Sequence, residues 1–236
     1  MSAVRTGRDG AAWTLTLERP ERGNALGEAL TDALHAALDA ALAGGARLVV
    51  LRGEGRNFCT GLDLSDLETA TEGDLALRIL RIEILLQRIH ALPVTTVAVA
   101  QGRVFGAGAD LFAACDHRLA LDGAAFAFPG PAFGLVLGTA RLAALVGEGA
   151  ARRLLLAGAP VPREAALEMG LATAGDESGL AAVREAAGRL DPETVAALHA
   201  RTRRADDAAD LAALARSVAR PGLKARVLAY RAAMAR

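Results

Sequence analysis

The sequence is short of several residue types, and each shortage excludes a class of protein. Lys224 is the only lysine among 236 residues. A phosphate-binding loop needs Gly-Lys followed by Ser or Thr, so nucleoside triphosphate hydrolysis by that route is excluded. Cys59 and Cys115 are the only cysteines, and no apolar run opens the chain. These features do not fit a secreted protein held by disulfides, so we expect a cytoplasmic protein.

An excess of charge of one sign is also lacking. The 27 basic and 27 acidic residues give a formal net charge of zero. Proteins that bind nucleic acids or anionic membranes usually carry a basic excess, which this sequence does not have. We therefore expect a small-molecule ligand and no nucleic acid partner.

One uncharged stretch, residues 123–140, approaches the length of a membrane-spanning helix. Pro129, Pro131 and four glycines interrupt it. Such breakers disfavour a spanning helix, which must satisfy its backbone hydrogen bonds internally. We predict a buried, turn-rich connection here and no membrane span.

Residues that bind metals or act as nucleophiles are sparse. The four histidines, His35, His90, His117 and His199, have no cysteine or carboxylate partner at the spacing of metal ligands. We therefore predict no metal site. No serine lies in a Gly-X-Ser-X-Gly context, so nucleophilic catalysis has no support.

Hydrophobic periodicity predicts an α/β fold. Hydrophobic residues make up 53% of the chain and charged residues 23%, which fits one folded core. Alternating or short apolar runs predict strands over Trp13–Glu18, Leu48–Arg52 and Thr95–Ala100. Apolar residues at helical spacing predict helices over Asn24–Leu42 and Asp74–Leu92. Strands alternating with helices of this size indicate helices packed over a sheet.

The pattern changes near Gly175, so we divide the chain into a core at 1–175 and a helical region at 176–236. Helical patterns without a strand candidate follow at 180–190, 192–200, 206–219 and 223–235. Their apolar residues are mostly alanine, so these helices need another surface to pack against. We predict that this region takes part in oligomerisation.

Two segments carry candidate chemistry, Asn57–Leu64 and Phe105–Leu111. Each follows a predicted strand, passes through glycine and is expected to enter a helix. Free backbone N–H groups at such turns suit a carbonyl oxygen on which negative charge develops. The alternative is that the glycines only allow close packing and that Asp63 and Asp110 are first-turn acids of ordinary helices.

Four motifs in order resemble the enoyl-CoA hydratase/isomerase, or crotonase, family. They are LERPERGNAL at 17–26, VVLRGEGRNFCTGLDL at 49–64, PVTTVAVAQGRVFGAGADLFAACDHR at 93–118, and the pair ARRLLLAG and EAALEMGLA at 151–158 and 164–172. The resemblance implies a spiral of repeated β-β-α units with a C-terminal α-helical region. It also implies a homotrimer or hexamer that binds an acyl-CoA thioester, with coenzyme A as part of the substrate and no separate cofactor.

The resemblance assigns roles to individual residues. The thioester carbonyl would lie between the backbone N–H groups of Leu62 and Ala107, where Ala107 replaces a glycine common in the family. Asp110 matches the first acidic position, and its apolar surroundings should raise its pKa. Asp63 matches a structural acid. The residues expected to bind substrate are Arg22, Ala25, Leu26, Thr60, Leu62 and Ala107, although Arg22 fits a solvated surface charge nearly as well.

The second family acid is missing. Hydratases carry glutamate after proline, whereas this chain reads Phe-Ala-Phe-Pro-Gly and ends the motif on Gly130. Hydration uses a second group that Gly130 cannot supply, but one carboxylate can shift a double bond. We therefore predict an isomerase with Asp110 as acid and base. The alternatives are a hydratase in which Asp122 or Glu148 replaces the missing acid, and a non-catalytic acyl-CoA-binding protein.

Overall fold

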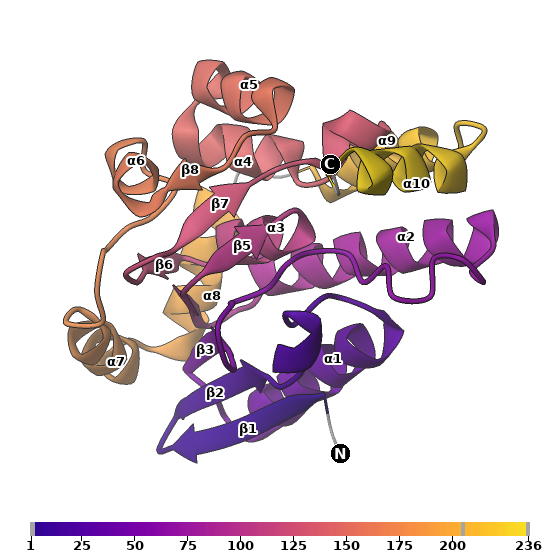
Figure 1. Cartoon of the computed structure of the whole chain (residues 1–236). Helices are drawn as coiled ribbons and strands as arrows, with labels where there is room; N and C mark the ends of the chain where they lie inside the picture. The colour runs from indigo at the N-terminus through magenta and orange to yellow at the C-terminus, as the bar shows by residue number, and fades with distance from the viewer. Residues whose placement is uncertain (1–2, 204–205, 235–236) are drawn as a thin grey trace.

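The computed structural model describes residues 3–203 and 206–234, which form two sheets surrounded by helices (Figure 1). The first sheet has the order β1-β2-β3-β4-β6 and the second the order β5-β7-β8. Only β1 and β2 are antiparallel in the first sheet. Its strands are β1 (Val4–Asp9), β2 (Ala12–Leu17), β3 (Leu48–Gly53), β4 (Thr95–Ala100) and β6 (His117–Ala120). Those of the second are β5 (Arg103–Phe105), β7 (Ala125–Ala127) and β8 (Val161–Pro162).

The chain winds as a spiral because each turn adds one strand to each sheet and then a helix. β4 and β5 lead into α3 (Ala107–Ala113), and β6 and β7 lead into α4 (Thr139–Val146) after the short 3₁₀ helix η2 (Gly130–Phe133). An isolated parallel bridge pairs Cys59 with Val104, so the segment after β3 extends the second sheet. The predicted repetition of β-β-α units is confirmed.

The helices between the strands begin and end where side chains satisfy the backbone. α2 (Glu72–His90) starts with a capping box, in which Thr71 and Asp74 bond each other's backbone N–H groups. α1 (Glu28–Ala43) starts later than predicted because Asn24 has a φ of 55°. The Asn24 amide donates to the carbonyl oxygens of Glu54 and Asn57, at 3.0 and 2.8 Å, which ties this loop to the segment after β3.

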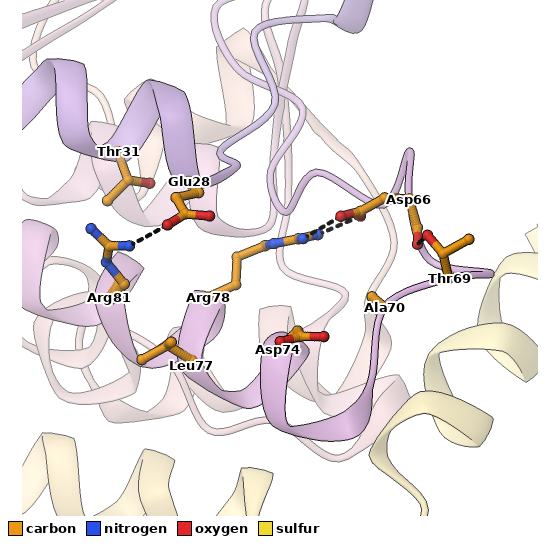
Figure 2. A pocket seen from close by; sticks show the side chains of 9 residues that line it. All are labelled: Glu28, Thr31, Asp66, Thr69, Ala70, Asp74, Leu77, Arg78 and Arg81. Atoms are coloured by element: carbon orange, nitrogen blue, oxygen red, sulfur yellow. Dashed lines mark hydrogen bonds and ion pairs between the residues drawn. The ribbon is translucent and has the colours of Figure 1, made fainter.

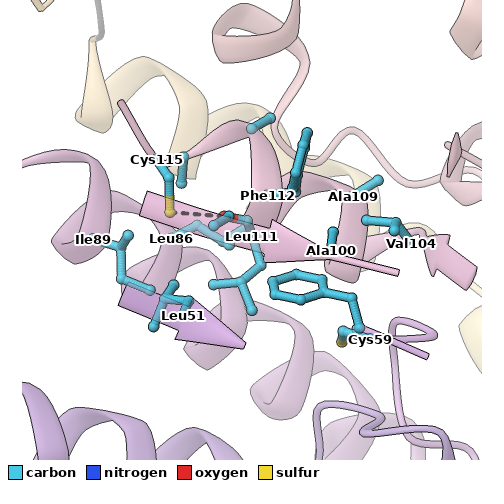
Figure 3. Close-up of a cluster of buried hydrophobic side chains, with 14 of the residues drawn as sticks. Leu51, Cys59, Leu86, Ile89, Ala100, Val104, Ala109, Leu111, Phe112 and Cys115 are labelled. Carbon is cyan, nitrogen blue, oxygen red and sulfur yellow. Dashed lines mark hydrogen bonds between the residues drawn. The ribbon is translucent and has the colours of Figure 1, made fainter. Parts of the chain in front are cut away.

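The helix α3 lies in the middle of the core, and all seven of its residues are buried. Leu111 and Phe112 pack among side chains from α2 and both sheets (Figure 3). The Phe112 ring lies 4.8 Å from that of Phe126, centroid to centroid. A Cβ at Gly108 would lie 2.2 Å from the carbonyl oxygen of Cys59, so only glycine lets α3 approach the first segment this closely.

Of the remaining helices, α5 lies between β7 and β8 and the others from α6 onward follow β8. They are α5 (Glu148–Ala157), α6 (Arg163–Glu168), α7 (Leu180–Arg189), α8 (Pro192–Thr202), α9 (Asp207–Val218) and α10 (Leu223–Met234), and a short 3₁₀ helix η1 (Pro20–Arg22) precedes α1. The four helices predicted after residue 176 are present. No helix in residues 3–203 and 206–234 is long and apolar enough to cross a membrane.

The alanine-rich helices α9 and α10 find the surface they need on this chain. Figure 1 shows α10 lying alongside α2, and both α9 and α10 contact α2. Leu214, Val218, Leu223 and Val227 form one apolar cluster with residues of α2 and η2. An oligomer is therefore not needed to bury these two helices. The division at residue 175 and the trimeric or hexameric state stay predictions.

Candidate active site

The two glycine-containing segments meet at a cavity of about 150 Å³. We call this cavity the acyl pocket, after the acyl group that the sequence motifs predict as its ligand. Its walls are mainly apolar, and Asp110 provides the only carboxyl group among its lining residues. Leu62, Thr60, Ala107 and Gly130 also line it, together with Phe105, Phe128, Phe133, Leu135, Leu137 and Tyr230.

The N–H of Leu62 is free because of the way its segment pairs with Leu26. The N–H of Leu26 donates to the carbonyl of Gly61 at 2.7 Å, and its carbonyl accepts from the N–H of Asp63 at 3.0 Å. In a parallel bridge of this kind the residue between the two bonded neighbours turns its own N–H and C=O to the opposite side. The N–H of Leu62 has no acceptor in the described part of the chain.

The N–H of Ala107 is free because Ala107 is the first residue of α3. Gly106 has a φ of 52°, and its carbonyl accepts from the N–H groups of Ala109 and Asp110. The first N–H groups of a helix have no intrahelical acceptor. No other described residue accepts a hydrogen bond from Ala107 N–H.

Gly61 holds these two N–H groups close together. Its φ is 97°, and a Cβ there would lie 2.7 Å from the carbonyl oxygen of Phe105 and 3.4 Å from the nitrogen of Ala107. Only glycine fits both the backbone conformation and the gap. Two unpaired N–H donors, one in the segment after β3 and one in the segment after β5, therefore border the acyl pocket.

The first segment does not enter a helix, contrary to the prediction. Residues 65–69 form turns, and α2 begins only at Glu72. The carboxyl of Asp63 instead stabilises a local turn, accepting from the N–H of Ser65 at 2.9 Å and from Arg19 at 3.0 Å. Asp side chains compete for backbone groups in this way. Asp63 is therefore structural as expected, but in a turn and not at a helix start.

Asp110 is buried, with 5% of its surface exposed, and its carboxyl has no hydrogen-bond donor in the described part of the chain. Burial raises the pKa of Asp110 to about 8, while Arg141 lowers it and Glu83 raises it further. The direction of this shift agrees with the one expected from the apolar surroundings of Asp110. At neutral pH the group is mostly protonated, and a modest rise in pH converts it to a base.

Of the other predicted substrate-binding residues, Thr60 lines the acyl pocket, whereas Arg22, Ala25 and Leu26 do not. Leu26 pairs with Leu62 and lies behind it. Ala25 is buried next to Leu26, while Arg22 is exposed with no ion-pair partner among the described residues. A Cβ at Gly23 would lie 2.8 Å from Thr60, so the loop that carries Arg22 runs past the pocket wall.

Neither acid considered as a replacement for the missing glutamate lines the acyl pocket. Asp122 is exposed and pairs with Arg163, and Glu148 on α5 pairs with Arg152 at the surface. Gly130 lies in the pocket wall at the position of the missing side chain.

The C-terminal helix α10 also contributes to the site, which was not predicted from the sequence. Tyr230 on α10 lines the acyl pocket, and its ring lies 5.1 Å from that of Phe133, centroid to centroid. The one sequence feature that marked Tyr230 is that aromatic residues are rare and that it is the only tyrosine. Aromatic residues supply large apolar area at the walls of ligand pockets.

A second cavity, of about 280 Å³, lies between α1, α2 and the turns at 65–69 (Figure 2). Four of its charged groups form ion pairs, and the fifth, Asp74, caps α2 through Thr71. Arg78 donates to both carboxylate oxygens of Asp66, at 2.8 and 2.6 Å, and Arg81 to Glu28 at 3.0 Å. These pairs support the loop, because Arg78 also donates to the carbonyl of Asp63 at 2.7 Å.

Comparison with known proteins shows the family of this chain. The sequence profile described as enoyl-CoA hydratase/isomerase matches residues 8–216. The chain belongs to this family. A probable enoyl-CoA hydratase, echA6 of Mycobacterium bovis, is 37% identical over 165 residues, which are 69% of this chain and 66% of that protein. The match thus spans about two thirds of this curated relative.

Solved structures of the family share the fold. A Bordetella parapertussis protein assigned to the family is 46% identical, with a TM-score of 0.95 over 98% of this chain and 99% of that one. An enoyl-CoA hydratase/isomerase from Xanthobacter autotrophicus Py2 is 28% identical, with a TM-score of 0.82 over 99% and 98% of the two chains. The two sheets and their helices are therefore a crotonase fold, as the motifs predicted.

Proposed function

We propose that this member of the family binds an acyl-CoA thioester and shifts the position of a double bond in its acyl chain. The thioester carbonyl accepts hydrogen bonds from Leu62 and Ala107, and Asp110 transfers the proton. The observation that carries this proposal is that Asp110 is buried and holds the one carboxyl among the described residues lining the acyl pocket. Two unpaired N–H groups border the same pocket.

The two N–H groups act on the charge that forms during the reaction. Removal of a proton beside the thioester places negative charge on the carbonyl oxygen. Preorganised donors stabilise that charge without reorganising, and one such donor is worth about 2.7–4 kcal/mol in the transition state. Both donors belong to the main chain, so alanine at position 107 supplies the same group as glycine.

One carboxyl group suffices for the proton transfers. The Asp110 carboxylate takes a proton from C2 of a 3-enoyl thioester, and the C–H electron pair moves through the carbonyl to form a dienolate. The carboxylic acid then returns the proton to C4, which gives the 2-enoyl thioester. The proton and the electrons balance, and no water is consumed.

Hydration is the second candidate, because the relatives named above include a probable enoyl-CoA hydratase. Hydration requires a group that activates water as well as one that protonates carbon. Among the described residues Asp110 is the only one with a carboxyl that lines the acyl pocket, and Gly130, where the motif predicts the second acid, has no side chain. The pocket chemistry therefore favours isomerisation over hydration.

For the coenzyme A portion we propose binding along the loop at 22–26 and Thr60. Arg22 is exposed there and has no ion-pair partner in the described part of the chain, so it is free to meet a phosphate. Ala25 and Leu26 shape the backbone beside Leu62, and Thr60 borders the path into the acyl pocket.

Replacement of Asp110 by Asn tests the proposal. The wild type and the variant are compared on 2-enoyl- and 3-enoyl-CoAs, with acyl-CoA binding measured separately. We expect isomerisation to fall by roughly 10²–10⁴, the range of general acid–base catalysis, while binding persists. Binding without any turnover by the wild type would instead identify a non-catalytic acyl-CoA-binding protein.

A further inference from the structure

A buried ion pair joins α2 to α4 close to Asp110. Arg141 donates to the two carboxylate oxygens of Glu83 at 2.9 and 2.5 Å, and both side chains are 1% exposed. Desolvation largely offsets the attraction in such pairs, so apolar replacements are often equally stable. A pair buried at this depth beside a pocket acid therefore suggests a role other than stability.

The first turn of α4 connects this pair to Asp110. Gly138 precedes α4, and a Cβ on it would lie 2.1 Å from Oδ1 of Asp110. Arg141 follows three residues later, which is about one helical turn. The pair is outside the acyl pocket, since neither Arg141 nor Glu83 lines it.

Arg141 is the cation that acts on Asp110, and it lies among several carboxyl groups. Glu83 on α2 binds it directly, and Oδ2 of Asp210 on α9 lies 3.9 Å from its Nη1 atom. Asp110 on α3 is the third carboxyl that it attracts, while Glu83 repels Asp110. Tyr230 on α10 is the other titratable group lining the acyl pocket.

Further contacts fix the position of this charge cluster. The Gln87 amide donates to Glu83 at 2.9 Å and to the carbonyl of Asp207 at 2.9 Å. α2 and α9 are thereby joined at the ion pair. Both Nη atoms of Arg141 donate to Glu83, so these contacts hold the guanidinium in one place relative to α2.

We propose that Arg141, held by Glu83, is a positioning residue whose fixed charge determines the pH range in which Asp110 exchanges its proton. The biological meaning of this role rests on the proposed function. The role itself is a property of Asp110 and can be measured without substrate.

The test is a pH titration of the Asp110 carboxyl by ¹³C NMR in aspartate-labelled protein, with the signal assigned from Asp110→Asn. Glu83→Gln removes the repelling charge but keeps a partner for Arg141, so we expect the midpoint to fall by about one pH unit. The double variant Glu83→Met with Arg141→Met also removes the positive charge of Arg141. Its attraction for the Asp110 carboxylate is larger than the repulsion by Glu83, so the midpoint of the double variant should lie above that of the wild type. The double variant leaves no buried charge unpaired, which favours folding.

Glu148→Gln is the matched control, because it neutralises a carboxylate that is paired with an arginine at the surface. Its midpoint should equal that of the wild type. Midpoints that stay unchanged in both test variants, or that move in the same direction, would overturn the role of Arg141.

Migration of the double bond in a 3-enoyl-CoA, followed by NMR, separates this proposal from the proposed function. Midpoints that shift in opposite directions in the two test variants, without bond migration by the wild type, would support the role of Arg141 and refute the isomerase. Bond migration with unmoved midpoints would refute the role of Arg141 and leave the isomerase in place.

Discussion

Gly138 lies directly against the carboxyl of Asp110, and a Cβ at this position would be 2.1 Å from Oδ1 and 2.8 Å from Cγ. Its φ of 63° also favours glycine. The proposed acid and the start of α4 thus leave no room for a side chain between them.

Replacement of Gly138 by Ala should displace the Asp110 carboxyl and lower isomerase activity by about 10²-fold, since small misplacements of catalytic groups have effects of this size. Gly158→Ala is a close control, because Gly158 has a φ of 62° and no neighbour within 4 Å of a Cβ. Both variants carry similar backbone strain. Equal activity losses in the two variants would show that strain, and not the position of Asp110, is responsible.

Replacement of Gly61 by Ala tests the paired N–H groups. The added methyl would push the first segment away from Phe105 and Ala107, so the two donors could no longer meet one oxygen. We expect turnover to fall by roughly 10²–10³, as for loss of one oxyanion donor. Gly123→Ala, at a φ of 75° with open space around it, is the control. Retained turnover in Gly61→Ala would contradict this assignment.

The pH dependence of stability reports on Asp110. Folding raises the pKa of Asp110 from 3.8 to about 8. The neutral acid therefore contributes fully to the free energy of unfolding below about pH 4, and this contribution is lost as the pH rises to about 8. Asparagine does not ionise, so the free energy of unfolding of Asp110→Asn should not fall in this way. The variant should therefore gain unfolding free energy relative to the wild type, by up to about 1.4 kcal/mol per pH unit in this window.

Urea unfolding at several pH values measures the difference. Asp122→Asn, at an exposed carboxyl, controls for the loss of one charge. A constant difference between Asp110→Asn and the wild type from pH 4 to 8 would mean that Asp110 is ionised as easily in the folded state as in the unfolded chain.

Tyr230 should contribute to acyl binding through its ring and not through its hydroxyl. Tyr230→Ala removes an aromatic wall of the acyl pocket and its contact with Phe133. Loss of about 1.4 kcal/mol of apolar contact corresponds to tenfold weaker binding. Calorimetry with a non-hydrolysable acyl-CoA analogue checks this, with Tyr230→Phe as the matched variant. Equal weakening in both variants would assign the effect to the hydroxyl.

Gly130→Glu should introduce hydration. The φ of Gly130 is not positive, and a Cβ there would meet only Leu135, at 3.7 and 3.9 Å, so the backbone accepts a side chain. A second carboxyl in the acyl pocket could activate water. We expect a 3-hydroxyacyl product from a 2-enoyl-CoA with this variant, detected by mass spectrometry. Gly130→Gln, which cannot accept the proton, should give none.

Local patterns predicted the parts of the fold that depend on neighbours in sequence. β4 was predicted residue for residue, and α2 was displaced by only two residues because its capping box lies before the apolar stripe. The start of α1 was predicted four residues too early, since the hydrogen bonds of Asn24 to Glu54 and Asn57 are long-range contacts. The turns after Asp63 were read as a helix for a similar reason, because Arg19 holds that carboxyl from another loop.

The residues of the site also divide into those within local motifs, which were predicted, and those brought together by long-range contacts, which were not. Leu62, Ala107, Asp110 and Thr60 were recognisable because each lies in a contiguous motif, and the structure brings all four to one pocket. Tyr230 and the pair of Arg141 and Glu83 come from helices far apart in the chain, and no spacing rule connects them with Asp110.

The most direct test of the central claim is incubation of the wild-type protein with a 3-enoyl-CoA in deuterated water, followed by NMR and mass spectrometry. We predict a 2-enoyl-CoA with no added water, in which the C2 proton is carried to C4 by Asp110 and deuterium enters only where that proton exchanges with solvent first. A 3-hydroxyacyl product from the wild type, or saturable binding with neither deuterium uptake nor bond migration, would contradict the claim that Asp110 alone carries the proton in this pocket.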